Sequence, residues 1–221
     1  MRSLIFIFRI NIVMQSGEQR QRLIENLKQG GWLRTIRVTK AFQKVRREDF
    51  VPRRFREAAY IDEPLPIGEG QSISAPGMVA IMTELLEPKP GDSVLEVGTG
   101  SGYQAAILSK LVKKVYTTEL EPRLAGEAKE KLKKAGCSNV EVVIGDGSGG
   151  YPKAAPFDRI VITCAAAEVP APLKQQLKTG GMLVAPVGGS FTQILTRLKK
   201  KKNGRFEKNE YLRCIFVPLR H

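Results

Sequence analysis

From residue 90 onward, short runs of strand-forming residues alternate with helical patterns, and this alternation most constrains the fold. The runs that favour strands are Ser93–Val97, Val115–Glu119, Val140–Ile144, Arg159–Thr163 and Met182–Pro186. The helical patterns between them are Gly102–Leu111, 124–135 and Pro170–Leu177, with Gly180-Gly181 expected to end the last helix. Strands that alternate with helices in this way predict an α/β domain with a mostly parallel sheet.

The C-terminal part departs from this alternation. Two strand-like runs, Gln193–Lys199 and Phe206–Val217, lie on either side of a lysine-rich segment. Asn203-Gly204 within that segment favours a type I′ turn. We therefore predict an antiparallel hairpin at the edge of the sheet.

Residues 17–60 are basic and helical in pattern. The apolar positions that share a helix face are Leu23, Ile24 and Leu27 in a first helix, and Val38, Ala41, Phe42 and Val45 in a second. Gly30-Gly31 separates the two helices. Residues 61–76 are rich in Pro, Gly and Ser, which predicts a long loop or extended segment, and a helix is expected over 76–86.

These patterns suggest how the chain is organised. We expect residues 1–17 to form an N-terminal extension and 18–221 a single domain. Within it, 18–75 would form a helical and loop region on the substrate side, and 76–221 the α/β core.

Composition excludes several kinds of chemistry. The 221 residues include one histidine, His221, at the very end, so a Ser-His-Asp triad or a histidine zinc site is not expected. The three cysteines form no CxxC pair, which predicts free thiols in a reducing compartment and no bound metal. The apolar run over residues 1–13 is too short to cross a bilayer, so we expect a cytoplasmic protein without a membrane partner.

The sequence VLEVGTGSGY, residues 94–103, carries the clearest functional signal. A predicted strand ends there and glycines follow at 98, 100 and 102, which allow a sharp turn and a close approach of the backbone to a ligand. Tyr103 stands where a dinucleotide fingerprint requires its third glycine, and no P-loop pattern is present. Glu119 ends the next strand, where an acidic side chain suits a ribose diol. These features predict a nucleoside-containing cofactor.

The Glu-x-Gly-x-Gly-x-Gly pattern resembles the glycine loop of class I S-adenosylmethionine methyltransferases, which have a Rossmann-like sheet. A carboxylate at Glu96 would repel a pyrophosphate but suits the ammonium of a methionine moiety. The resemblance implies that Asp146, after the third strand, faces the adenine amino group. The cofactor-binding residues expected on this basis are Glu96, Gly98, Thr99, Gly100, Gly102, Glu119, Leu120, Asp146 and Gly147.

A more specific resemblance covers residues 18–219. The segment YIDEPLPIGEGQSISAP, residues 60–76, closely resembles the one that precedes the glycine loop in protein-L-isoaspartate O-methyltransferases. The blocks that follow in the same order are VLEVGTGSGY, GDGSGGYP, APFDRIVIT, VPAPLKQQLKTGGMLVAPVG and FVPL. The family methylates the free carboxylate of L-isoaspartyl residues, and D-aspartyl residues more weakly, which starts repair through a succinimide.

The resemblance implies roles for the loop residues. Ser74 would be the catalytic hydroxyl that holds the substrate carboxylate, with Ser72 and Ile73 near the cofactor. Ser72 is more often threonine in the family, and Cys164 replaces a usual alanine. A carboxylate is ionised at neutral pH, so its attack on a methyl group needs no general base and no histidine.

Three alternatives remain open at this point. Lys199–Lys202 and the basic N-terminal region, part of a net charge of +14, could bind RNA phosphates and make this an RNA-directed methyltransferase. Residues 162–167 lack the Asn/Asp-Pro-Pro-aromatic motif of amino methyltransferases. Cys164 in this stretch could attack a pyrimidine, although no Pro-Cys motif is present. The chain could also be a non-catalytic cofactor-binding module. We expect a monomer that acts on isoaspartyl proteins and peptides, and no nucleic-acid partner.

Overall fold

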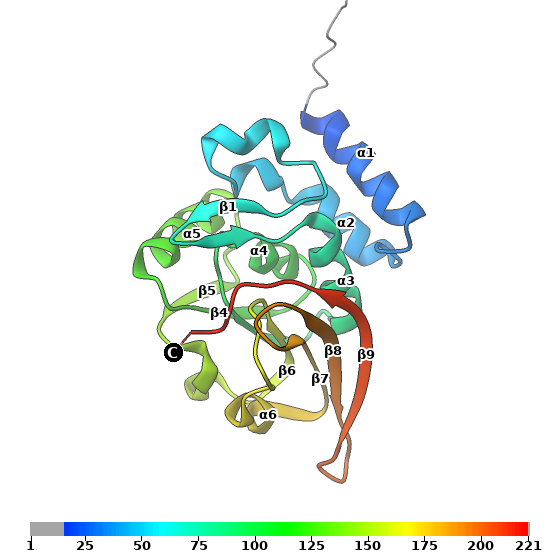
Figure 1. Cartoon of the computed structure of the whole chain (residues 1–221), viewed down its shortest axis with the longest axis vertical. Helices are drawn as coiled ribbons and strands as arrows, with labels where there is room; N and C mark the ends of the chain where they lie inside the picture. The colour runs from blue at the N-terminus through cyan, green and yellow to red at the C-terminus, as the bar shows by residue number, and fades with distance from the viewer. Residues whose placement is uncertain (1–15, 221) are drawn as a thin grey trace, which may run out of the picture.

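The computed structural model describes residues 16–220, so the predictions for residues 1–15 and for His221 lie outside it. The chain folds into a central sheet with helices on both faces, and a helical cap lies over one end (Figure 1). The helices are α1 (Ser16–Gln29), α2 (Ile36–Lys44), α3 (Pro76–Leu86), α4 (Tyr103–Ser109), α5 (Pro122–Lys134) and α6 (Ala171–Gln176). Short 3-10 helices span Arg47–Asp49, Arg53–Ala58, Gly147–Gly149 and Pro152–Ala154.

The main sheet contains seven strands in the order β5-β4-β3-β6-β7-β8-β9. They are β3 (Ser93–Val97), β4 (Lys114–Glu119), β5 (Val140–Ile144), β6 (Phe157–Ile162), β7 (Leu177–Gly188), β8 (Gln193–Lys200) and β9 (Phe206–Cys214). The first five in this order pair in parallel, and the β7–β8 and β8–β9 pairs are antiparallel. The strand order reverses between β3 and β6, where α/β sheets form a ligand crevice at their carboxyl ends. The predicted α/β fold with an antiparallel edge is confirmed.

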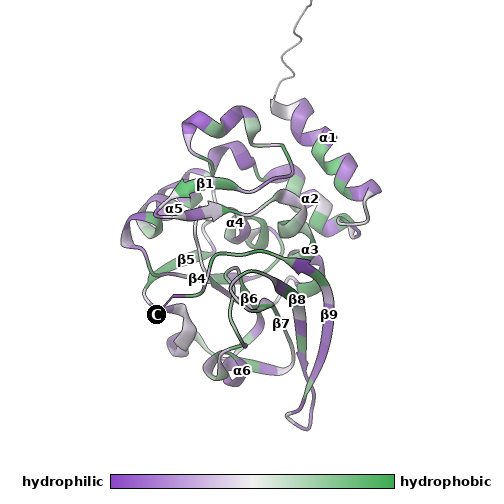
Figure 2. Cartoon of the chain, in the orientation of Figure 1, coloured by the Kyte–Doolittle hydropathy of each residue, from purple (hydrophilic) through white to green (hydrophobic). Residues whose placement is uncertain are grey.

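The N-terminal helices belong to the same hydrophobic core as the sheet. All seven apolar positions predicted to share helix faces in α1, in α2 and just after it are buried, and they pack in one cluster with α3 and α4. A second cluster covers the opposite face of the sheet and includes α6. Figure 2 shows α1 with hydrophobic residues at intervals along a mainly hydrophilic helix, and β9 as a mainly hydrophilic edge strand. No described helix is both long and apolar enough for a membrane span.

Residues 61–76 contain a small hairpin that the sequence pattern did not define. Strand β1 (Leu65–Gly68) pairs antiparallel with β2 (Gln71–Ile73) around the turn at Glu69 and Gly70. Ile67 is buried, and its Cδ1 atom lies 3.5 Å from where a Cβ on Gly100 would stand. The hairpin therefore packs directly on the glycine loop.

Two local predictions were wrong. The helix expected over Pro170–Leu177 ends at Gln176, and Leu177 already pairs with Phe157 as the first residue of β7. Gly180 and Gly181 thus lie within this irregular strand and do not end the helix. The pairing with β6 holds the chain extended from Leu177, whose side chain is buried at 1% exposure.

The turn of the C-terminal hairpin also differs from the expected type I′. Gly204 has a φ of +78°, but Asn203 is not among the described residues with positive φ. The Gly204 N–H donates to the Lys201 carbonyl over 3.0 Å, and the Lys201 N–H donates to the Arg205 carbonyl over 2.8 Å. This is a three-residue loop, a type I turn followed by a left-handed glycine.

Two glycines should respond to alanine in opposite directions. Gly102 has a φ of +87°, and a Cβ there would lie 3.2 Å from Leu132, so Gly102→Ala should cost about 1–3 kcal/mol of folding free energy. Gly126 lies inside α5 with open space around it, so Gly126→Ala should add about 0.5–1 kcal/mol. Urea denaturation of both variants measures the difference, and equal effects would contradict this reading.

Candidate active site

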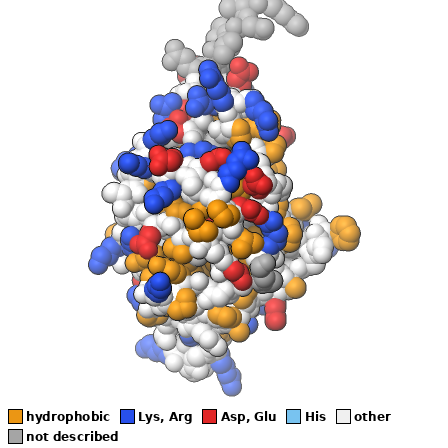
Figure 3. Space-filling view, turned by 90° about the vertical axis from the view of Figure 1, so that its left-hand side faces the viewer, with side chains coloured by type: hydrophobic (Ala, Val, Ile, Leu, Met, Phe, Trp, Pro, Cys, Tyr) orange, Lys and Arg blue, Asp and Glu red, His pale blue; other side chains and the backbone are white. Residues whose placement is uncertain are grey.

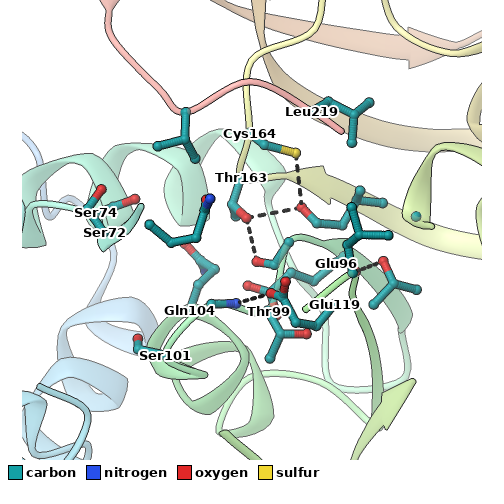
Figure 4. A pocket seen from close by; sticks show the side chains of 18 of the residues that line it. Ser72, Ser74, Glu96, Thr99, Ser101, Gln104, Glu119, Thr163, Cys164 and Leu219 are labelled. Atoms are coloured by element: carbon teal, nitrogen blue, oxygen red, sulfur yellow. Dashed lines mark hydrogen bonds between the residues drawn. The ribbon is translucent and has the colours of Figure 1, made fainter. Parts of the chain in front are cut away.

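A cavity lies at the carboxyl ends of β3, β4 and β6, between the glycine loop and the β1–β2 hairpin. Ten predicted site residues line it: Ser72, Ile73, Ser74, Glu96, Gly98, Thr99, Gly100, Glu119, Leu120 and Gly147. Figure 4 shows Ser72 and Ser74 on one side of it and Glu96 and Glu119 on the other. The structure therefore brings the predicted cofactor loop and the predicted acceptor loop together.

Backbone hydrogen bonds fix the shape of the glycine loop. The N–H groups of Gly98 and Thr99 both donate to the Thr118 carbonyl over 3.0 Å. Gly98 has a φ of +97°, and a Cβ there would lie 2.5 Å from the Thr163 Oγ1 atom. A side chain at this position would collide with the end of β6, so the tight turn after β3 requires glycine.

Glu119 ties the loop to the next strand. Its Oε2 atom accepts a hydrogen bond from the Gly100 N–H over 2.7 Å, and its Oε1 atom accepts one from the Glu121 N–H over 3.1 Å. The side chain is 7% exposed and still lines the cavity. Each carboxylate oxygen can accept a further hydrogen bond, which leaves capacity for a diol.

Glu96 is the most perturbed group of the cavity. Its Oε2 atom accepts a hydrogen bond from the Thr117 hydroxyl over 2.7 Å, and the Thr117 Oγ1 atom lies 2.7 Å from that of Thr99. Its Oε1 atom is buried without a partner. Burial raises the pKa of the Glu96 carboxyl to about 8, with a smaller contribution from the negative charge of Glu119. Such a carboxyl suits a ligand that brings a cation or several N–H donors.

A second unpartnered acceptor in the cavity comes from Gln104, which the sequence analysis missed. The Thr83 hydroxyl donates to the Val79 carbonyl over 2.7 Å, so its oxygen can only accept the hydrogen bond from the Gln104 Nε2 atom, 3.0 Å away. The Gln104 Oε1 atom is consequently fixed as an acceptor, and it has no partner. Its place one residue after Tyr103, in the helix that follows the glycine loop, was the signal available.

The serine loop forms the other wall. Strand β2 ends at Ile73, which is buried, and Ser74 follows half-buried before α3 begins at Pro76. Ser72 and Ser74 also line an adjoining hollow with Met78 and Phe216. The two serines thus face both the cofactor cavity and a neighbouring space that could take an acceptor.

The segment after β9 closes a further side of the cavity, which no sequence pattern indicated. Ala165 donates from its N–H to the Val217 carbonyl over 2.7 Å and accepts from the Leu219 N–H over 2.7 Å. Arg220 pairs with Glu121 at 2.7 Å. Residues 217–220 therefore line the cavity, although they are distant in sequence from the glycine loop.

Two predicted cofactor residues do not line the cavity. Gly102 begins α4 and packs against α5, as the 3.2 Å approach to Leu132 shows. The Asp146 carboxylate accepts hydrogen bonds from the Ser148 N–H over 2.8 Å and from the Ser148 hydroxyl over 2.9 Å. Its neighbours Gly145 and Gly147 do line the cavity.

Cys164 lies in the cavity wall, but its thiol is not activated as a nucleophile. Burial raises the pKa of its thiol to about 12, and the charges of Glu119 and Glu96 act in the same direction. Since the thiolate is the nucleophilic form, this environment does not activate a cysteine. In the part of the chain that the structure describes, no group of His, Cys, Asp and Glu side chains could hold a metal ion.

Comparison with known proteins identifies what the site resembles. The family model described as protein-L-isoaspartate (D-aspartate) O-methyltransferase matches residues 18–221. A protein-L-isoaspartate O-methyltransferase of Methanopyrus kandleri is 52% identical over 204 residues, which cover 90% of each chain. One from Staphylothermus marinus is 51% identical over 210 residues, which cover 91% of this chain and 93% of the relative.

Solved structures agree with these relatives. A protein-L-isoaspartate O-methyltransferase from Plasmodium falciparum, determined in complex with S-adenosyl-L-homocysteine, superposes with a TM-score of 0.80 at 27% identity. The match covers 91% of this chain and 98% of the other.

The Glu96 carboxyl should make stability depend on pH. Its folded-state pKa of about 8 exceeds the unfolded value, so its contribution to stability is present below about pH 4.5 and is lost as pH rises towards 8. Glu96→Gln removes this dependence, so the melting temperature of the variant relative to the parent should be higher at about pH 8 than at about pH 5. An unchanged difference between the two pH values would show that Glu96 is not perturbed.

Proposed function

This chain belongs to the protein-L-isoaspartate (D-aspartate) O-methyltransferase family, and we propose on that premise that it methylates the free carboxylate of L-isoaspartyl residues in damaged proteins, and D-aspartyl residues more weakly. The following backbone amide nitrogen would then attack the ester carbonyl and expel methanol, giving a succinimide that water opens partly to normal aspartate. The observation that carries the proposal is the placement of Ser74 in one cavity with the glycine loop and Glu96.

The cavity fits S-adenosylmethionine, which when bound supplies an electrophilic methyl group on its sulfonium. The buried, unpartnered Oε1 atoms of Glu96 and Gln104 suit N–H donors such as the methionine ammonium. Glu119 suits the ribose diol. The proposed cofactor contacts also include Asp146, whose adjacent glycines line the cavity. Gly102 would contribute by holding α4 in place, since it faces α5.

The chain's own residues account for the remaining chemistry. An acceptor carboxylate arrives ionised, because its ordinary pKa is about 4. The Ser74 hydroxyl would donate a hydrogen bond to one carboxylate oxygen and so direct the other towards the methyl group. The β1–β2 hairpin and residues 217–220 flank the cavity and would limit water. Catalysis would thus rest on alignment, without a proton transfer.

RNA methylation is supported less well by the same surface. On the face that Figure 3 shows, Lys and Arg side chains are numerous towards the N-terminal end of the molecule, and Asp and Glu side chains are interspersed among them. Nucleic-acid phosphates bind to a continuous stripe of positive charge, and a surface of mixed charge does not provide one. The high pKa of Cys164 also argues against pyrimidine attack, and Ser74 in the cavity argues against a non-catalytic module.

The proposal also covers the cellular compartment, the oligomeric state and the domain boundaries. All three cysteines are buried and free, which supports a cytoplasmic protein. We also propose that the protein acts as a monomer on isoaspartyl proteins and peptides. The family match begins at residue 18, which supports an extension over 1–17 and one catalytic domain from 18.

Methyl transfer to matched peptides tests the function. With labelled S-adenosylmethionine, the enzyme should label an isoaspartyl peptide and leave the same peptide with normal aspartate unlabelled. The label should be lost in mild base, because it is a carboxyl ester. Equal labelling of both peptides, or base-stable label found only on RNA, would refute the proposal.

Replacement of Ser74 separates catalysis from cofactor binding. Ser74→Ala should lower turnover, because the acceptor carboxylate loses its alignment, while S-adenosylhomocysteine affinity should change by less than about 1 kcal/mol in calorimetry. Ser190→Ala, in the exposed turn between β7 and β8, is the matched control and should alter neither quantity. A large loss of cofactor affinity in Ser74→Ala would assign this serine a different role.

A further inference from the structure

Arg47 is the largest fully buried side chain among the described residues, and none of the cavity chemistry above uses it. No described carboxylate forms an ion pair with its guanidinium, although the negative charge of Asp62 favours its charged form. Instead it donates to four backbone carbonyls: Ala59 at 2.7 Å, Ile61 at 3.4 Å, Glu63 at 3.1 Å and Ser74 at 2.9 Å. Burial disfavours the charged form and lowers the pKa of this guanidinium.

These four carbonyls belong to two separate pieces of the acceptor side. Three lie in residues 59–63, which lead into the β1–β2 hairpin, and the fourth belongs to Ser74, which follows it. A guanidinium is a rigid planar fork, so one that bonds to both pieces fixes the distance between them. Lysine carries the same charge but cannot reproduce this geometry.

Asp62 links residues 59–63 to α3 by a further hydrogen bond. Its Oδ1 atom accepts a hydrogen bond from the Gly77 N–H over 2.6 Å, in the first turn of α3. A Cβ on Gly77 would lie 2.6 Å from the Asp62 Oδ2 atom, so the fit is close. Residues 59–63 are therefore tied to Ser74 through Arg47 and to Gly77, three residues further on, through Asp62.

Arg47 also touches the cofactor side. Its guanidinium carbon lies 5.9 Å from the centre of the Tyr103 ring. Tyr103 is the first residue of α4, directly after the glycine loop, and it lines the cavity. One side chain thus contacts both the acceptor loop and the element that begins at the cofactor loop.

We propose that Arg47 is a positioning residue for methyl transfer, which holds the backbone of Ser74 at a fixed place relative to the glycine loop. This inference rests on the proposed function. Arg47 itself does not reach the acceptor, because its terminal nitrogens are occupied by the four carbonyls. Its effect on catalysis passes through the Ser74 hydroxyl.

Arg47→Lys tests the proposal. Turnover on an isoaspartyl peptide, counted per S-adenosylhomocysteine site titrated by calorimetry, should fall about 100-fold, as expected for a misplacement of about 1 Å. Cofactor affinity should change by less than about threefold. Arg46→Lys is the matched control, because Arg46 is adjacent and exposed, its ion pairs are with Glu48 and Asp49, and it should leave turnover within about twofold.

A double-variant cycle separates positioning from a merely structural role. If Arg47 acts through Ser74, Arg47→Lys should reduce the residual turnover of Ser74→Ala by less than about threefold. Full, multiplicative losses in the cycle would overturn the proposal, and so would normal turnover in Arg47→Lys. If Arg47→Lys does not fold, Asp62→Ala loosens the same segment from α3 and should show the same non-additivity with Ser74→Ala.

Failure of the underlying function is distinguishable. If the parent protein methylates no isoaspartyl peptide, the proposed function fails, whereas the position of Ser74 can still be measured. Amide hydrogen exchange over residues 72–75 should then be faster in Arg47→Lys than in Arg46→Lys. Equal protection in the two variants would overturn the positioning role independently of activity.

Discussion

The site depends on one buried carboxyl group. Glu96 lies on β3, in register with Thr117 of β4, and the Thr117 hydroxyl satisfies one of its oxygens while the other has no partner. A fold retains such a group where a ligand completes its hydrogen bonding. The parallel pairing of β3 with β4 and β6 places this oxygen at the point where the strand order reverses. The rest of the cavity is built around it.

The acceptor side of the cavity has a different physical requirement, which is to position the substrate carboxylate. A carboxylate nucleophile needs no proton removed, so the chain must supply alignment and exclusion of water. The serine loop, the Arg47 fork and the segment 217–220 provide rigid surroundings for that purpose. The shortage of histidine in the sequence, which first removed triads from consideration, agrees with this chemistry.

Local patterns predicted much of this arrangement. The strands that end at Val97 and Glu119 follow from runs of strand-forming residues, with glycine after the first run, and parallel pairing brings their ends together. What the sequence could not supply were contacts between distant segments. Gln104 depends on Thr83 for its orientation, Arg220 on Glu121, and Arg47 on the Ser74 carbonyl. Gly180-Gly181 was expected to end α6, but Leu177 already pairs with Phe157 of β6, and this long-range pairing places both glycines within β7.

Proton release on cofactor binding tests the central claim, that this cavity takes the ammonium of S-adenosylmethionine at Glu96. In the free protein the pKa of Glu96 is about 8, so its carboxyl is mostly protonated at neutral pH, and an ammonium beside it would favour the ionised form. Titration with S-adenosylhomocysteine in buffers of different ionisation enthalpy should therefore reveal release of close to one proton at about pH 7, and none in Glu96→Gln. Binding without proton release in the parent protein would contradict the account.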